Sequence, residues 1–190
     1  MEPAFLILLA LVFVPLIWFI GNYNGLVGLR NHCQESWSGI DTELKRRHNL
    51  IPNLVETVRG YAAHEERVLK LVMEARAQAR EEAEGNASPS RLAEDENRLV
   101  SSLGGLFAVA EDYPDLKADR HFLQLQKELV NTEDRIQSAR RFYNANVRDL
   151  NNRIEMFPSS IVAGMFGFQK AEYFELDEFS HRLPPEVNLT

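Results

Sequence analysis

Apolar side chains recur every three or four residues along most of this chain. The longest run extends from Leu29 to Ala79 and includes Trp37 and Ile40. Spacings of three and four match the 3.6-residue turn of an α-helix, so these side chains would lie on one buried stripe. The pattern predicts one long amphipathic rod. Pro52 lies near the middle of this rod, and two geometries are possible there.

The first geometry is a bend within a continuous helix, because Pro52 removes one backbone hydrogen bond at a cost of about 3 kcal/mol without breaking the apolar period. The second is a reversal of the chain at Pro52, since a residue before proline is biased away from helix. The preceding Asn49-Leu50-Ile51 is poor turn chemistry and favours the bend.

Two further helices follow the rod. Residues 84–91 combine a Gly-Asn stop with Ser88 as N-cap and a proline in the first turn, so a helix is expected to begin there. It ends at Tyr113. Asp115 is expected to cap a longer helix whose apolar stripe reaches Phe157. No alternation typical of strands competes with this interpretation, and the pattern is that of an all-α helical bundle.

The last segment, 158–190, is different in character. It mixes glycine, aromatic and acidic residues without a helical period, and its apolar side chains are too many to leave in water as one patch. We expect this tail to fold back on the bundle. Glycines flank its Met-Phe pair, which also fits an element that inserts into lipid or docks on a partner. The candidate residues are Met165, Phe166, Phe168, Tyr173 and Phe174.

The N-terminal segment predicts a membrane anchor. Residues 3–21 carry no charge and would span about 29 Å as a helix, close to the thickness of a bilayer core. A cleaved signal peptide is the alternative, but a basic region before the run and a small-residue cleavage site after it are both missing. Arg30 and the bases after it favour a cytoplasmic body. The anchor residues include Phe5, Leu9, Phe13, Ile17 and Trp18.

Composition narrows the function. The 190 residues carry a formal charge of −7, which is not the basic balance of a nucleic-acid-binding protein. Cys33 is the single cysteine, so an internal disulfide and a Cys-rich zinc site are excluded. Because Cys33 falls on the apolar stripe, we interpret it as a small core residue rather than a nucleophile.

Candidate chemistry is sparse. His64-Glu65-Glu66 resembles the start of a zinc-protease helix, but Val68 stands where the second histidine is required. A carboxylate-bridged di-iron bundle needs a Glu-x-x-His pair on each of two helices, and the sequence has this spacing once, at Glu178 and His181 in the tail. We therefore expect no metal, no cofactor, no evident small-molecule substrate and no enzymatic activity.

Four segments carry a resemblance to a known family. They read "YNGLVGLRNHCQESWSGID", "ELKRRHNLIPNLVETVRGYAAHE", "FLQLQKELVNTEDRIQSARRFYNANVRDLNN" and "FPSSIVAGMFGFQKAEYFEL", in that order between Tyr23 and Leu176. Together they resemble the LemA family of bacterial membrane proteins. Cys33 replaces a small apolar residue, and His48 stands where aspartate is frequent; neither departure weakens the match.

The resemblance implies a single-span anchor at 1–23, an antiparallel helical bundle of the four-helix up-and-down type at 24–157, and no established enzymatic activity. A branch of the family is associated with magnetosome membrane biogenesis, which makes membrane organisation one available hypothesis. The expected function is a scaffold or adaptor in the cell membrane that self-associates and docks other membrane proteins. A membrane-shaping protein that acts directly on lipid is the alternative.

Two charged residues lie on the apolar stripe, Arg47 and Glu65. They are 18 residues apart, about 27 Å along a straight helix, so they cannot pair with each other. Either they snorkel at the edge of the stripe or pair with neighbouring helices of the same bundle, or they set the register between subunits. If the rod is only bent, Trp37 and Ile40 lie near the membrane without a covering helix, which predicts a homo-oligomer.

Overall fold

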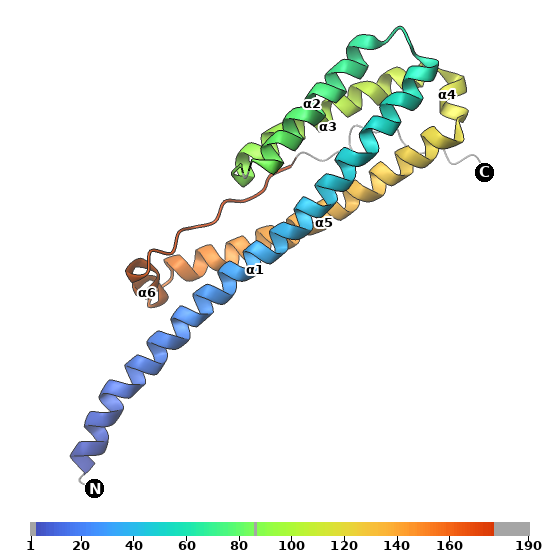
Figure 1. Ribbon diagram of the computed structural model, residues 1–190. Helices are drawn as coiled ribbons and strands as arrows, with labels where there is room; N and C mark the ends of the chain where they lie inside the picture. The colour runs from blue at the N-terminus through green and yellow to red at the C-terminus, as the bar shows by residue number, and fades with distance from the viewer. Residues whose placement is uncertain (1–2, 86, 177–190) are drawn as a thin grey trace. The chain divides into compact units, whose positions relative to one another are not determined.

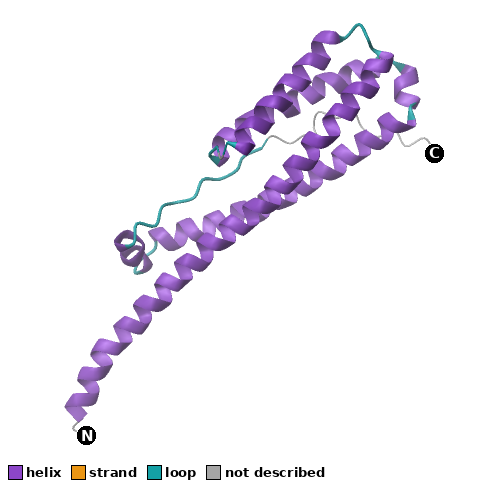
Figure 2. Ribbon diagram, in the orientation of Figure 1, coloured by secondary structure: helices purple, strands orange, loops and turns teal. Residues whose placement is uncertain are grey.

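The computed structural model describes the backbone of residues 3–85 and 87–176, and the side chains of these residues except 3–8 and 10. Figures 1 and 2 show that the elements in this part of the chain are all helices. They are α1 (Pro3–Tyr61), α2 (Glu66–Glu84), α3 (Pro89–Glu111), α4 (Pro114–Ala118), α5 (Arg120–Glu155) and α6 (Ser159–Met165). The expectation of an all-α protein is confirmed for the described residues.

Helix α1 continues through Pro52, so the chain does not reverse there. Proline has no N–H to donate to the carbonyl four residues earlier, which belongs to His48. The Nε–H of Arg76 in α2 donates to that carbonyl oxygen instead, at 2.6 Å. A neighbouring helix thus satisfies the acceptor that the proline leaves free, which explains how a helix of 59 residues tolerates it.

The chain leaves the helix later than a reversal at Pro52 requires and earlier than a continuous rod to Ala79 requires. Helix α1 ends at Tyr61, and α2 begins at Glu66 after a short turn in which the N–H of Glu65 donates to the Ala62 carbonyl at 3.1 Å. The continuous rod to Ala79 is therefore wrong, and Glu65 lies at the start of α2. The apolar period does not reveal the end of α1, because both helices bury one face. Gly60, in the last turn of α1, was the local signal for a helix end.

The beginnings of α3 and α5 lie at residue types that favour a helix start. Helix α3 starts at Pro89 with Ser88 at the N-cap, as predicted. The long helix α5 is capped by Asp119 and not by Asp115, because one carboxylate oxygen of Asp119 accepts hydrogen bonds from the N–H groups of His121 and Phe122, both at 2.9 Å. Asp115 belongs to the separate short helix α4.

The chain divides into two compact units, which are described one at a time. Unit 1 comprises residues 1–37 and 142–171. Within it, the first part of α1 runs antiparallel to the last part of α5. Arg153 donates to the Asn22 side chain at 2.8 Å, Asn146 donates to the His32 carbonyl at 3.4 Å, and the rings of Trp37 and Tyr143 lie 5.1 Å apart.

Unit 2 comprises residues 38–141 and 172–190. The end of α1 and the start of α5 are antiparallel here too, since Arg46 contacts Glu128 at 3.2 Å and Tyr61 donates to Asp119 at 3.0 Å. Helix α2 packs on α3. Fully buried apolar side chains fill the centre of this unit, among them Ile51, Leu54, Val58, Val72, Leu99, Leu103, Leu106 and Leu129.

Ile40 and Leu44 are completely buried within a single chain. The expectation that this stretch of α1 lacks a covering helix is therefore wrong. Helix α5 is long enough to follow α1 past this point, as the contact of Glu43 with Arg135 at 3.8 Å shows. The apolar stripe at Ile40 and Leu44 does not need a second subunit.

The described part of the tail forms α6 and then an extended segment to Leu176. In unit 1, Asn151 holds the segment by two hydrogen bonds of 2.9 Å to the backbone N–H and carbonyl of Ala171. In unit 2, Phe174 and Leu176 are buried, and Arg140 donates to the Leu176 carbonyl. The tail is thus tied to α5 within each unit.

Candidate functional site

A cluster of charged side chains lies in the interior of unit 2, where three helices meet. Arg47 of α1 contacts Glu96 of α3 at 2.5 Å and Glu133 of α5 at 2.9 Å, using its two terminal nitrogens. The arginine side chain is 3% exposed, Glu96 0% and Glu133 7%. Arg47 therefore joins α1, α3 and α5 of one chain.

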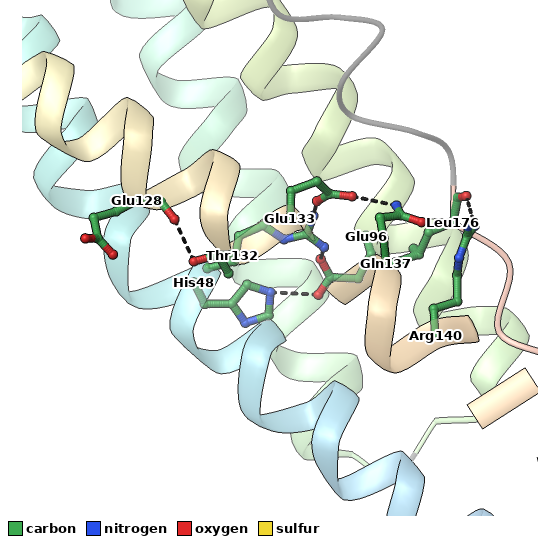
Figure 3. Close-up of polar contacts among 9 residues, drawn as sticks. His48, Glu96, Glu128, Thr132, Glu133, Gln137, Arg140 and Leu176 are labelled. Atoms are coloured by element: carbon green, nitrogen blue, oxygen red, sulfur yellow. Dashed lines mark hydrogen bonds and ion pairs between the residues drawn. The ribbon is translucent and has the colours of Figure 1, made fainter. Parts of the chain in front are cut away.

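Two further side chains complete the cluster (Figure 3). The Nε2 of His48 lies 2.7 Å from the second carboxylate oxygen of Glu96, and the side-chain amide of Gln137 donates to Glu133 at 2.6 Å. Both oxygens of each carboxylate thus have a partner. The Nε–H of Arg47 has none among the described residues, so the cluster is well but not fully satisfied.

The electrostatics of the cluster depend on Arg47. Burial by itself would raise the pKa of the Glu96 carboxyl, but the positive charge of Arg47 and the hydrogen bond from His48 outweigh burial and lower it. Two carboxylates face one guanidinium, so removal of the arginine would leave two buried negative charges without a cation.

The cluster is suited to holding helices together and poorly suited to chemistry on a substrate. Glu96, Arg47 and His48 have almost no surface in contact with solvent. The hollow of about 370 Å³ that lies in unit 2 is a different place, open to solvent and lined by surface side chains of α1 and α5 such as Asn53, Thr57 and Gln124.

Glu96, Glu133 and His48 were not among the interaction candidates predicted from the sequence. A signal for Glu96 was present, because it lies four residues after Leu92 and three before Leu99, on the buried face of α3. An acidic residue at such a position predicts a buried cation on another helix, and Arg47 was already a candidate. Glu133 follows the buried Thr132 and gave a weaker signal.

In unit 1 the structure brings two of the predicted tail residues together with α1. The ring of Phe166 lies 4.6 Å from that of Tyr23 and 5.8 Å from that of Phe19. Phe168 lies 6.0 Å from Tyr23, and the guanidinium of Arg30 lies over the Phe168 ring at 5.4 Å. These contacts place the turn after α6 against α1.

The remaining interaction candidates lie apart. Trp37 is half-buried against Tyr143, Glu65 is half-buried at the start of α2, and Phe174 is buried in unit 2. Met165 and Tyr173 are exposed. The sequence-predicted set is therefore not one site: its members are divided between the two units and between interior and surface.

The anchor candidates lie on a helix that is long and apolar enough to cross a membrane by length and composition. Leu9, Phe13, Ile17 and Trp18 are all exposed, and so are the large apolar side chains Leu11, Val12, Val14 and Leu16. Phe5 lies outside the described side chains. A helix segment that is apolar and uncovered on all sides fits a lipid environment.

Cys33 is buried in unit 1, and burial followed by the charge of Asp149 raises the pKa of its thiol. A raised pKa disfavours the nucleophilic thiolate. In the part of the chain that the structure describes, no three His, Cys, Asp or Glu side chains gather in a way that could hold a metal ion.

The fold and the cluster define a class: an all-helical protein with an exposed apolar N-terminal helix and a body held by an interior ion cluster. Comparison with known sequences makes the class specific, because the LemA family profile matches residues 36–189. The chain belongs to the LemA family.

Individual relatives have similar levels of identity. "Magnetosome protein MamQ 2" of Paramagnetospirillum magneticum is 28% identical over 175 residues, which cover 80% of this chain and 64% of that protein. "Protein LemA" of Metamycoplasma hominis is 27% identical over 179 residues, covering 93% of this chain and 80% of the relative. The matched region thus spans less than two thirds of the Paramagnetospirillum protein.

Proposed function

We propose that this protein is a non-enzymatic scaffold or adaptor, anchored in the cell membrane by the first part of α1 as a single span. Its body is a four-helix up-and-down bundle on the cytoplasmic side, built from the end of α1, α2, α3 and the start of α5. One contrast supports the proposal most directly. The apolar side chains at the start of α1 are exposed, whereas the charged side chains in the interior of unit 2 are paired with each other.

Membership of the LemA family supports this role, and a relative named as a magnetosome protein supports a place in membrane organisation. The buried Arg47 cluster supports a rigid body, because it fixes three helices and leaves no charged group at its centre free to act on a substrate.

The topology has a direct test. Cys33→Ala removes the natural thiol, and Glu81→Cys places a new one on an exposed position of α2. A maleimide that cannot cross membranes should leave this cysteine unlabelled in intact cells and label it after lysis. Labelling in intact cells would place the body on the outside and refute the cytoplasmic location.

Self-association needs a new surface, because Ile40 is buried and Ile40→Glu would unfold the body. Leu123 and Val130 are exposed apolar residues seven apart on α5, hence on one side of that helix. We expect the full chain in mild detergent to have the mass of more than one protomer by light scattering. Leu123→Glu with Val130→Glu should dissociate it while helicity is kept.

Exposed Leu71 on α2 gives a matched control, since Leu71→Glu adds charge at a distance from the α5 surface. A wild-type monomer would refute self-association. Docking of other membrane proteins is tested by chemical crosslinking in native membranes followed by affinity purification, with the α5 double variant as comparison. Loss of the same crosslinked proteins from that variant would assign them to the α5 surface.

A second candidate is a membrane-shaping protein that acts on lipid directly. The specific observation in its favour is the charge of unit 1, whose four basic residues (Arg30, Arg148, Arg153 and Lys170) equal its four acidic ones (Glu2, Glu35, Asp149 and Glu155). The whole excess of acid therefore belongs to unit 2, so unit 1 has no net repulsion from anionic lipid. Vesicles that change shape on addition of the full chain, seen by electron microscopy, would favour this candidate.

A further inference from the structure

Among the described residues outside the N-terminal segment, most of the strongly exposed apolar side chains lie on and around α6, with Phe142 of α5 as the exception. Ile161 and Met165 are one turn apart on its outer side and are 53% and 68% exposed, while Val162 and Ala163 on its inner side are buried. The turn before α6 exposes Phe157 by 79%, and the residue after α6, Phe166, is 52% exposed. An outward apolar surface of this kind on a short element indicates a binding surface.

The inner side of α6 is already satisfied by the protein. The hydroxyl of Ser159 donates to the carbonyls of Arg153 and Met156 at 2.7 and 2.8 Å, so this polar group is turned inward. The positions of α6 that remain outward are apolar or glycine, apart from the partly covered Ser160. The exposed apolar surface therefore cannot be explained as the far side of an amphipathic helix, which would be polar.

The position of this surface along α1 indicates what covers it. Phe166 contacts Phe19 and Tyr23, and the uninterrupted apolar run of α1 ends at Gly21, directly before the polar Asn22. Phe166 thus lies beside the last turn of the apolar helix, where a spanning segment would pass from hydrocarbon to headgroups. Exposed apolar side chains at this level meet the lipid that surrounds α1.

Polar contacts mark the other boundary of this level. Arg153 donates to Asn22, and Arg30, about 10 Å further along α1 than Tyr23, lies over the ring of Phe168. Cationic side chains with apolar stems are typical of the headgroup region. The sequence of contacts from Phe19 to Arg30 is therefore the sequence expected across a membrane interface.

We infer that α6 and its two flanking turns form an interfacial wedge, defined as Met156, Phe157, Ile161, Met165 and Phe166, which inserts into the headgroup and acyl boundary of the bilayer that α1 spans. The wedge holds unit 1 at a fixed depth, as amphipathic interfacial elements do. The balanced charge of unit 1 lets it approach either neutral or anionic lipid. The inference rests on the proposed anchoring by α1.

The test uses the full chain in phosphatidylcholine vesicles, with and without phosphatidylcholine brominated on its acyl chains. Trp18→Phe and Trp37→Phe remove the two natural tryptophans. A single tryptophan is then introduced by Phe166→Trp, by Met165→Trp or, as a matched control in the same unit, by Phe142→Trp. Phe142 is 63% exposed and lies on α5 about 20 Å before that helix ends.

Bromine quenches only nearby tryptophan, so both wedge variants should lose at least roughly twice the fraction of emission lost by the control, as expected for side chains at the acyl boundary. Equal quenching at Phe166→Trp, Met165→Trp and Phe142→Trp would overturn the wedge. So would blue-shifted emission that bromine leaves unchanged and that depends on protein density in the vesicle, because a second copy of the chain would then cover the surface.

A variant with Trp37→Phe alone separates the two proposals. It keeps Trp18 within the apolar helix, where bromolipid should quench it strongly. Quenched Trp18 with an unquenched wedge would leave the anchor in place and refute the wedge. Unquenched Trp18 would refute the anchor, and with it the basis of the wedge. Circular dichroism of each variant must show the wild-type helicity.

Discussion

Replacing Arg47 by methionine tests the interior ion cluster most directly. Methionine keeps an unbranched apolar side chain of similar length but removes the charge and the contacts with Glu96 and Glu133. Two carboxylates would then stay buried without a cation. Removal of one partner from a buried ion pair costs about 3 to 5 kcal/mol, largely as the penalty of stranded charge. We expect a loss of this size in the free energy of unfolding.

The adjacent arginine is a matched control. Arg46 also pairs with a glutamate of α5, at 3.2 Å, but its side chain is 44% exposed and that of Glu128 39%. Water and salt screen such a pair, which contributes about 0 to 1 kcal/mol. Arg46→Met therefore changes the same residue type, one position away, with an expected loss of less than about 1 kcal/mol.

The assay is urea unfolding of the full chain in mild detergent, followed by circular dichroism. Equal slopes of unfolding free energy against urea would show that the variants and the wild type unfold over the same surface. Losses for Arg47→Met and Arg46→Met that agree within about 0.5 kcal/mol, the usual range for surface substitutions, would refute the reasoning.

A third variant separates stranded charge from lost contact. Glu96→Gln and Glu133→Gln, added to Arg47→Met, remove both negative charges while the glutamine at position 96 can still bond His48. If stranded charge is the main penalty, this triple variant is more stable than Arg47→Met alone. If it is less stable, the lost contacts dominate and the electrostatic account is wrong.

Three further predictions address other features. Arg76→Met should lower the free energy of unfolding by about 1 to 3 kcal/mol, because it leaves the buried His48 carbonyl without a donor. The loss should be smaller in a Pro52→Ala background, where that carbonyl regains a helical N–H, and equal losses in a double-mutant cycle would count against this link. The pKa of Glu96 is lowered in the folded state, so its contribution to stability is present above its unfolded pKa of about 4.3 and is lost as pH falls through the lower folded value. Below about pH 4.3, the free energy of unfolding should therefore fall more steeply with pH for the wild type than for Glu96→Gln. Parallel curves would contradict the assignment. Cys33, buried and with a raised pKa, should react with iodoacetamide only at urea concentrations that unfold unit 1, and rapid alkylation of the native chain would show that it is not a core residue.

The sequence predicted most of what depends on local chemistry. The all-α fold and the start of α3 at Ser88-Pro89 followed from periodicity and capping rules, and both are confirmed for the described residues. The end of α1 did not follow, because the apolar period runs unbroken from Tyr61 to Val68 although the backbone turns between them. Periodicity reports which face is buried, and it cannot report whether two buried faces belong to one helix.

The ion cluster could not be predicted from the sequence for a different reason. Arg47 was recognised as a charge on an apolar face, but its partners are 49 and 86 residues away in the sequence. Pairing over such separations is set by tertiary packing. The unexpected burial of Ile40 has the same origin, since it depends on how far α5 follows α1. A search for acidic residues on other buried faces would have found Glu96.

The hydrogen bond from Arg76 to the His48 carbonyl has a mechanical consequence for α1. An α-helix resists bending through its ladder of backbone hydrogen bonds, and proline removes one rung. Here the missing rung is replaced by a side chain of another helix. The bending stiffness of α1 around residues 48–52 therefore depends on the packing of α2. Helix α1 resists bending there while α2 is packed against it, and it bends more easily when α2 is not.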